Sequence, residues 1–296
     1  MLKLLVSRRL PESVMAAAAD RFDVTCRAVT TPMDHAECVA ALRDHDIILP
    51  TLGDAFRAPA FAEAGPPRAR LLANFGVGYN HIDVAAARAA GLAVTNTPGA
   101  VTDATADIAL TLILMTARRA GEGERMLRAG AWAGWHPTQM LGMHVSGRRV
   151  CIVGMGRIGQ AIARRCHFGF GCSIVYANRT PKPVDFPAEQ MDLPAALGLA
   201  DIVVLATPGG ADTHHLMGAR EFAAMQRHAI FVNISRGDVV DETALVAALH
   251  AGQIAGAGLD VYEFEPAVPP ALMAMENVTL LPHLGTAALD VREDMG

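Results

Sequence analysis

Residues 149–180 constrain the fold most, because they alternate between the patterns of a strand, a helix and a second strand. Arg149–Val153 is short and rich in β-branched residues, whereas Ile158–Cys166 is apolar at helical spacing. Ser173–Ala177 is the second predicted strand. A Gly-x-Gly-x-x-Gly turn joins the first strand to the helix, at Gly154, Gly156 and Gly159. Such glycines permit a tight turn, close approach to a pyrophosphate and close packing of helix on strand.

This unit predicts a dinucleotide site, and the competing interpretation is a glycine turn that binds no ligand. Amide groups and the helix dipole favour an anion at the start of a helix. We therefore expect the whole turn to line the cofactor. Its residues are Gly154, Met155, Gly156, Arg157, Ile158 and Gly159.

The end of the second strand indicates which dinucleotide binds. An NAD site usually carries Asp or Glu about 20 residues past the glycines, where it holds the ribose hydroxyls. This chain has Asn178, Arg179 and Thr180 there, with no carboxylate before Asp185. Arg179 would attract a 2′-phosphate, and its two neighbours can donate hydrogen bonds to it. We expect NADP(H) to be preferred and NAD(H) to be usable; alternatively, Arg179 is merely solvated and NAD binds adequately.

Length, charge and composition limit the number of domains and the possible partners and location of the protein. A chain of 296 residues can form two domains with separate cores. The net charge of −5 and the lack of a basic tract argue against nucleic acid as a partner. The longest apolar run, Ile108–Ala117, is too short to cross a membrane. Five cysteines without metal-ligand spacing favour reduced thiols, no metal site and a cytoplasmic location.

Short strands alternate with helices on both sides of the glycine motif, which predicts an α/β fold. We expect two doubly wound parallel-sheet domains, of Rossmann and flavodoxin-like type, with an active-site cleft between them. Pro98-Gly99 marks the boundary. Residues 1–98 are the expected substrate-binding domain, which residues 284–296 rejoin, and residues 99–283 are the expected NAD(P)-binding domain.

Polar residues recur where predicted strands end, and ligands of parallel sheets bind at that edge. In the second domain these residues are Thr207, Arg236, Asp260 and His283. In the first domain, the glycine loop 76–80 can offer amide groups to a small carboxylate. The competing interpretation of that loop is a plain glycine turn.

Three of the later residues suit hydride transfer between a nicotinamide and a 2-keto acid. Arg236 can hold the carboxylate and polarise the carbonyl, since its fork matches a carboxylate and stays charged. His283 can protonate the oxygen, and a glutamate of the Asp260–Pro266 turn, Glu263 or Glu265, can stabilise the imidazolium. Each residue also has a non-catalytic interpretation. The arginine could cap a strand, the histidine could be buried with its hydrogen bonds made within the protein, and the glutamate could be solvated in a turn.

The motifs around these residues resemble the D-2-hydroxyacid dehydrogenase family, over essentially the whole chain. They are Gly76–Asp83, Thr95–Gly99, Thr105–Asp107, the glycine turn, Asn233–Gly237, Asp260–Pro266 and Leu281–Thr286. The resemblance implies that Arg236, Glu265 and His283 are catalytic. Glu263, the other glutamate of its turn, is expected to face solvent.

The resemblance also implies how substrate and cofactor are held. The amides of Val77 and Gly78 would bind the substrate carboxylate, together with Arg236 and His283. Asp260 would lie near the nicotinamide amide. The residues expected along the cofactor, beyond the glycine turn and the 178–180 segment, are Thr105, Thr207, Pro208, Thr213, Ile234, Ser235, Arg236, Asp260, His283 and Gly285.

Within the family, the sequence is most similar to the glyoxylate/hydroxypyruvate reductases, in which turns like 178–180 accompany NADPH. This similarity implies a homodimer through residues 120–148, with Trp135 as a candidate to enter the partner's pocket. The alternative for this segment is packing on its own subunit. Family members usually continue past Gly296 as a helix that returns to the first domain, so we expect either that this domain lacks its closing element or that the sequence is cut short.

The resulting hypothesis is an NADPH-preferring reductase of glyoxylate and hydroxypyruvate to 2-hydroxy acids. A different acid within the same family is one alternative. A phosphorylated substrate is disfavoured, because the 51–54 and 76–80 loops carry no cation. The alternative from another class is a dinucleotide-sensing, corepressor-like binding protein on the same scaffold, which would bind dinucleotide but reduce keto acids poorly.

Overall fold

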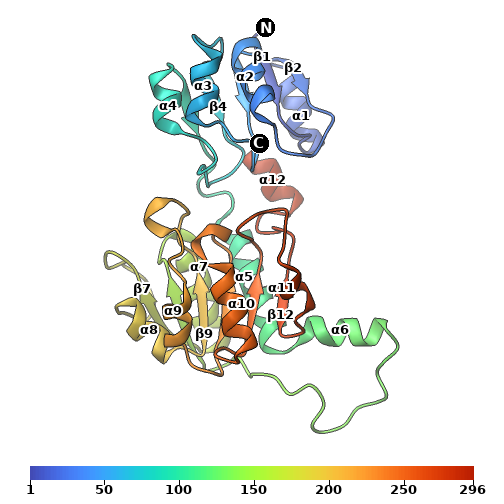
Figure 1. The fold of residues 1–296 in the computed structure, drawn as a ribbon, viewed down its shortest axis with the longest axis vertical. Helices are drawn as coiled ribbons and strands as arrows, with labels where there is room; N and C mark the ends of the chain where they lie inside the picture. The colour runs from blue at the N-terminus through green and yellow to red at the C-terminus, as the bar shows by residue number, and fades with distance from the viewer. The chain divides into compact units, whose positions relative to one another are not determined.

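The computed structural model describes residues 1–296, which form two compact units, each built on one parallel sheet (Figure 1). Unit 1 comprises Met1–Val101 and Thr286–Gly296, and unit 2 comprises Thr102–Gly285. The sheets have five and seven strands, and every strand pairing in them is parallel. The predicted α/β class with two parallel sheets is therefore confirmed.

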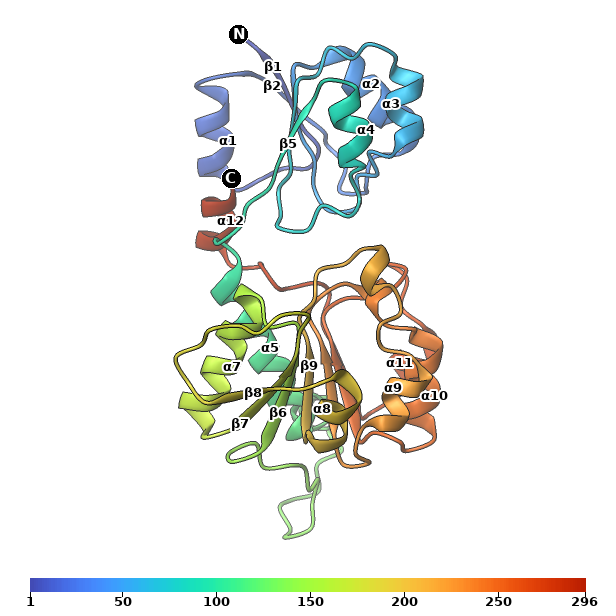
Figure 2. The ribbon, with the colours of Figure 1, turned by 90° about the vertical axis from the view of Figure 1, so that its left-hand side faces the viewer.

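Unit 1 has the flavodoxin-like strand order β2-β1-β3-β4-β5. Its strands are β1 (Lys3–Val6), β2 (Asp23–Cys26), β3 (Ile47–Leu49), β4 (Leu71–Ala73) and β5 (Ala93–Thr95). Its helices are α1 (Glu12–Ala19), α2 (His35–Asp44), α3 (Ala58–Ala64), α4 (Val84–Ala89) and α12 (Leu289–Met295). Helices α2, α3 and α4 pack on one face of the sheet, and α1 packs on the other. Beside α1 lies α12, where Ser13 Oγ donates a hydrogen bond to Glu293 (Figure 2).

Unit 2 has the strand order β12-β11-β10-β9-β6-β7-β8. Its strands are β6 (Arg149–Val153), β7 (Ser173–Ala177), β8 (Ala188–Gln190), β9 (Ile202–Leu205), β10 (Ile230–Asn233), β11 (Gly256–Leu259) and β12 (Val278–Leu280). Its helices are α5 (Thr102–Ala117), α6 (Ala120–Arg128), α7 (Arg157–Phe170), α8 (Leu193–Leu199), α9 (Ala219–Ala224), α10 (Glu242–His250) and α11 (Pro270–Ala274), with short 3₁₀ turns η1 (Ala211–Thr213) and η2 (Gly237–Val239). Helices α5 and α7 cover one face of the sheet, and α8 to α11 cover the other (Figure 2).

Burial on both faces explains the sequence of the central strands. All residues of β9 and β10 are buried, so these strands are continuously apolar rather than alternating, apart from Asn233 at the end of β10. The strand order reverses between β6 and β9, because β7 lies on one side of β6 and β9 on the other. Ligands of doubly wound sheets bind beside such a reversal, at the carboxyl ends of the strands.

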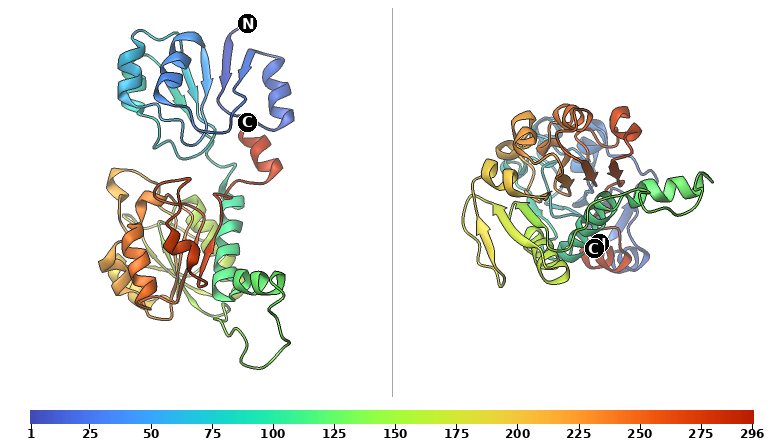
Figure 3. Two further views of the ribbon diagram at one scale, coloured as in Figure 1. Left: turned by 45° about the vertical axis from the view of Figure 1, so that its right-hand side comes forward. Right: turned by 90° about the horizontal axis from the view of Figure 1, so that it is seen from below.

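Helix α6 and the segment after it stand away from the rest of unit 2 (Figure 3). None of the α6 residues is buried, and four large apolar side chains between residues 127 and 141 are exposed. They are Leu127, Trp132, Trp135 and Leu141. No helix combines the length and the hydrophobicity needed to cross a bilayer.

Candidate active site

The glycine turn after β6 has the geometry of a phosphate cradle. A Cβ atom on Gly159 would lie 2.2 Å from the Gly154 carbonyl oxygen, so only glycine lets α7 pack this closely on β6. In contrast, a Cβ on Gly156 would meet no atom within 4 Å. The turn is therefore tight where the helix meets the strand and open where α7 begins. This arrangement fits a pyrophosphate at the helix start.

The 178–180 segment borders the glycine turn. Asn178 accepts a hydrogen bond from the Met155 amide at 3.2 Å and donates one to the Thr180 carbonyl at 2.8 Å. These two hydrogen bonds of the Asn178 side chain connect the glycine turn to the segment that follows β7. The side chain of Arg179 is 88% exposed, and its Nη1 lies 3.6 Å from an oxygen of the equally exposed Asp212. Exposed pairs of this kind are weak, so Arg179 can exchange this partner for an anion.

Two of the three predicted catalytic residues are in direct contact. His283 follows β12, Glu265 lies in the turn after β11, and His283 Nδ1 is 2.9 Å from Glu265 Oε2. The ionised carboxylate can only accept, so Nδ1 carries the hydrogen of this bond. The other ring nitrogen, Nε2, is then the atom that can deliver a proton to a substrate oxygen.

The third predicted residue, Arg236, supplies the positive charge of this cluster. Burial raises the pKa of Glu265, but the hydrogen bond from His283 and the charges of His283 and Arg236 outweigh burial and lower that pKa overall. Burial lowers the pKa of Arg236, and the charges of Glu265 and Asp238 oppose this effect. Glu265 is therefore ionised at neutral pH, and it can stabilise a protonated His283.

Asp260 holds the turn that carries His283. The residue is 2% exposed, and its carboxylate accepts hydrogen bonds from the amides of Leu284, at 2.6 Å, and Gly285, at 2.9 Å. Thr105 donates to the Gly285 carbonyl at 3.2 Å. His283 itself has φ of +54°, in the left-handed region that non-glycine residues rarely adopt. These contacts fix a backbone conformation that a histidine would not keep alone.

Asn233 holds the turn that carries Arg236, and this role was not predicted from the sequence. This last residue of β10 is 1% exposed, accepts from the Ser235 amide at 3.0 Å and donates to the Arg236 carbonyl at 3.2 Å. The signal was available, since a polar residue ended an otherwise apolar strand. Nearby, the hydroxyls of Thr207 and Ser235 are buried without a hydrogen-bond partner, which fits a ligand that brings polar groups to this edge.

The expectation that Glu263 faces solvent is wrong. Its side chain is only 13% exposed, and Oε1 lies 2.7 Å from His215 Nε2. Its backbone amide donates to Glu242, a buried residue at the start of α10, at 3.0 Å. The hydrogen bond to Glu242 thus keeps Glu263 away from solvent. The contact between Glu263 and His215 links the 208–216 loop to the 260–265 turn. Sequence reasoning missed His215 and Glu242 as well.

The close approach of two backbone segments joins Arg236 to this turn. A Cβ atom on Gly237 would lie 1.8 Å from the Tyr262 carbonyl carbon and 2.3 Å from the Glu263 nitrogen. No side chain larger than hydrogen fits there. The segment with Arg236 and the segment with Glu265 are consequently in backbone contact.

The remaining predicted residues lie on several elements. Thr213 ends η1, where its hydroxyl donates to the Pro208 carbonyl at 2.7 Å, and Ile234 is buried after β10. Val77 and Gly78 belong to the loop after β4 of unit 1. Trp135, in the segment after α6, is 79% exposed.

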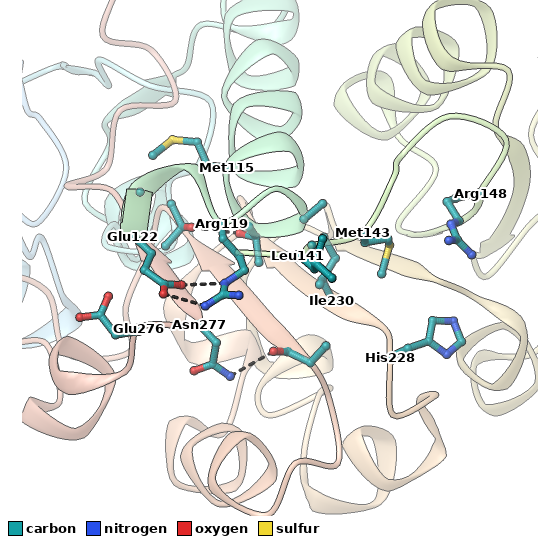
Figure 4. A pocket seen from close by; sticks show the side chains of 16 residues that line it. Met115, Arg119, Glu122, Leu141, Met143, Arg148, His228, Ile230, Glu276 and Asn277 are labelled. Atoms are coloured by element: carbon teal, nitrogen blue, oxygen red, sulfur yellow. Dashed lines mark hydrogen bonds and ion pairs between the residues drawn. The ribbon is translucent and has the colours of Figure 1, made fainter. Parts of the chain in front are cut away.

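A separate hollow of about 780 Å³ lies at the opposite, amino-terminal edge of the unit 2 sheet (Figure 4). It is lined by the end of α5, the start of α6, the 141–143 segment and residues that precede or begin β6, β10, β11 and β12. An ion pair between Arg119 and Glu122 lies within it. None of the predicted site residues lines this hollow.

Comparison with known proteins places this geometry in a family. The family model described as D-isomer specific 2-hydroxyacid dehydrogenase, NAD binding domain, matches residues 110–285. Glyoxylate reductase of Thermococcus onnurineus is 42% identical over 300 residues, which cover 99% of this chain and 89% of that relative. Glyoxylate/hydroxypyruvate reductase B of Klebsiella pneumoniae is 38% identical over 299 residues, which cover 99% of this chain and 91% of that relative.

Comparison with crystal structures also finds 2-keto acid reductases. The NADPH-dependent glyoxylate/hydroxypyruvate reductase of Sinorhizobium meliloti, in complex with NADP and malonate, matches with a TM-score of 0.88 and 37% identity. The match covers 99% of this chain and 90% of that one. The chain therefore belongs to the D-isomer-specific 2-hydroxyacid dehydrogenase family, and the resemblance inferred from its motifs is confirmed.

Proposed function

We propose that this dehydrogenase is an NADPH-preferring reductase of small 2-keto acids, with glyoxylate and hydroxypyruvate as its substrates. The observation that carries the proposal is the contact between His283 and Glu265 with the charge of Arg236 beside it. The names of the relatives support the substrate class, and the NADP complex of the relative from Sinorhizobium meliloti supports the cofactor.

In the proposed reaction, the residues of this chain bind the acid and move one proton. Arg236 holds the substrate carboxylate and polarises the keto oxygen, and the amides of Val77 and Gly78 hold the same carboxylate. His283 donates its Nε2 proton to the keto oxygen, while Glu265 stabilises the imidazolium before transfer. When bound, NADPH supplies the hydride that reduces the keto carbon.

We assign cofactor binding to unit 2 and substrate binding to unit 1. The glycine turn would hold the pyrophosphate, and Arg179 with Thr180 would hold the 2′-phosphate. Asn178 would shape that site through its bonds to Met155 and Thr180. The remaining cofactor contacts would come from Thr105, Thr207, Pro208, Thr213, Ile234, Ser235, Arg236, Asp260, His283 and Gly285.

A kinetic panel tests the proposal directly. Glyoxylate, hydroxypyruvate and pyruvate are each reduced with NADPH and with NADH, and kcat/KM is compared. We expect the highest values for glyoxylate or hydroxypyruvate with NADPH. A preference for another acid would favour the second candidate within the family. Tight dinucleotide binding without turnover of any acid would favour the corepressor-like alternative.

Replacing Arg179 with alanine should raise the KM for NADPH roughly 10- to 100-fold, because a hydrogen bond to a charged group contributes about 1.5–3 kcal/mol. The KM for NADH should change little, since NADH lacks the 2′-phosphate. Arg220→Ala, which removes an exposed arginine from α9, is the matched control and should leave both constants near their original values. Equal losses for the two cofactors would contradict this role of Arg179.

The exposed apolar side chains of α6 and of the segment after it support a homodimer through residues 120–148, with Trp135 reaching the partner's pocket. Light scattering should give the mass of two subunits. Replacing both Leu127 and Trp132 with aspartate should give monomers, because charge opposes burial of these side chains in an interface. Leu289→Asp, at a position that is 68% exposed on α12, should leave the dimer intact. A monomeric wild-type protein would refute the assembly.

A further inference from the structure

We infer that Asn74 and Asn96 are positioning residues that aim the amide groups of Val77 and Gly78 at the substrate carboxylate. The inference rests on the proposed function, which assigns those two amides to the carboxylate. Both asparagines lie in unit 1, as does the loop that they hold.

Asn74 lies beneath the glycine loop that follows β4. The residue is 2% exposed, and its Nδ2 donates to the carbonyl oxygens of Gly76, at 3.0 Å, and Gly78, at 3.2 Å. The Thr97 amide also donates to the Gly76 oxygen, at 3.1 Å. Two carbonyl groups of the loop are thus directed toward a single buried amide.

Asn96 holds the carbonyl group between these two. It follows β5, which pairs with β4, and its Nδ2 donates to the Val77 oxygen at 2.8 Å. Three successive carbonyl oxygens of the loop, those of residues 76, 77 and 78, are therefore bound by the side chains of two asparagines.

Because the peptide bond is planar, hydrogen bonds to these carbonyl oxygens also fix the directions of the neighbouring amide groups. In a trans peptide, the carbonyl oxygen of one residue and the N–H of the next point in opposite directions. Fixing the Gly76 oxygen therefore fixes the Val77 N–H, and fixing the Val77 oxygen fixes the Gly78 N–H. Each of the two proposed carboxylate donors is set by a different asparagine.

Both donors remain available to a ligand. No hydrogen bond within unit 1 uses the N–H of Val77 or of Gly78. Successive amide groups that point to one side form a concave anion site. Without the asparagines these peptide planes can rotate, and their ordering would oppose substrate binding.

His81 fixes which way the Asn74 amide faces. Its Nε2 is 2.9 Å from Asn74 Oδ1, and the ring is 6% exposed. Since an amide oxygen can only accept, His81 donates this bond, and the NH₂ group of Asn74 is left to face the loop. Asn74→Asp would instead set carboxylate oxygens against the carbonyl oxygens of Gly76 and Gly78.

The test compares Asn74→Ala and Asn96→Ala with the wild-type holoenzyme. We expect each variant to raise the KM for glyoxylate about tenfold, in line with the loss of about one hydrogen bond to a charged group. The inhibition constant of oxalate, which carries a carboxylate but accepts no hydride, should rise by a similar factor. The Kd for NADPH should stay unchanged, and kcat should fall much less than KM rises. Asn74→Asp should raise both constants further than Asn74→Ala.

Asp83→Ala is the matched control, because Asp83 caps the start of α4, which follows the loop, at the Ala86 amide. It should lower the melting temperature but leave the glyoxylate KM and the oxalate inhibition constant unaltered. If the asparagine variants only lose thermal stability, as this control does, the inference is overturned. If instead the wild-type protein neither reduces keto acids nor binds oxalate, the proposed function itself fails.

Discussion

Replacing Arg236 with alanine is expected to abolish keto acid reduction but to weaken NADPH binding only slightly, because Arg236 is one of many proposed cofactor contacts. Burial lowers the pKa of this side chain, and its charge interacts favourably with that of Glu265. In the proposed reaction, its loss removes both the cation that binds the acid and the charge that polarises the carbonyl. Removal of one such stabilising donor costs about 10²–10³-fold in rate, so on the order of 10³-fold or more is expected for this double role.

Arg236→Lys separates the two contributions, because lysine keeps the charge but loses the planar fork. We expect an intermediate kcat and a raised KM. Asn233 binds the backbone of the turn and not the arginine side chain, so the turn should persist in both variants. Steady-state kinetics with glyoxylate and fluorescence titration with NADPH are the measurements. Turnover at the wild-type rate would remove Arg236 from the mechanism.

Loss of the His283 imidazole should slow reduction by about 10²–10⁴-fold, the usual contribution of a general acid. The substitution should spare cofactor affinity and the KM much more than kcat, because the proton moves only in the chemical step. The backbone complicates the choice of variant, since His283 has φ of +54°. His283→Asn is therefore preferred to β-branched replacements, as asparagine tolerates this region.

Glu265→Gln is the companion variant for His283. Glutamine can still accept a hydrogen bond from Nδ1, but it cannot stabilise the imidazolium by charge. We expect a loss in kcat smaller than that of His283→Asn. The double variant should be little worse than His283→Asn alone, since Glu265 acts through the histidine. Additive losses, or a fully active His283→Asn, would contradict the assignment.

The features that the sequence predicted are those that local patterns determine. The alternation of short strands with helices indicated parallel sheets, and polar residues recurred where the predicted strands end. Parallel strands present their carboxyl ends at one edge, so the placement of Arg236 and His283 at the ends of β10 and β12 followed from topology. The contact of Glu265 with His283 needed the resemblance to a family in addition.

The features that were not predicted depend on contacts between residues that are far apart in the sequence. Glu263 and His215 are 48 residues apart, and Asn96 and Val77 are 19 apart, so no periodic pattern records either pair. Helix α6 was missed for a different reason. It contains two glycines, which disfavour helices, and none of its residues is buried in the core of unit 2.

The backbone contact at Gly237 has a consequence for redesign of this enzyme. Because the chain beside Arg236 touches the chain before Glu265 with no room for a methyl group, neither segment can be exchanged alone. Chimeras that take residues 233–238 from one homologue and 260–266 from another should fold poorly unless their main-chain paths coincide. Redesign of this part of the chain should therefore graft both segments from one parent.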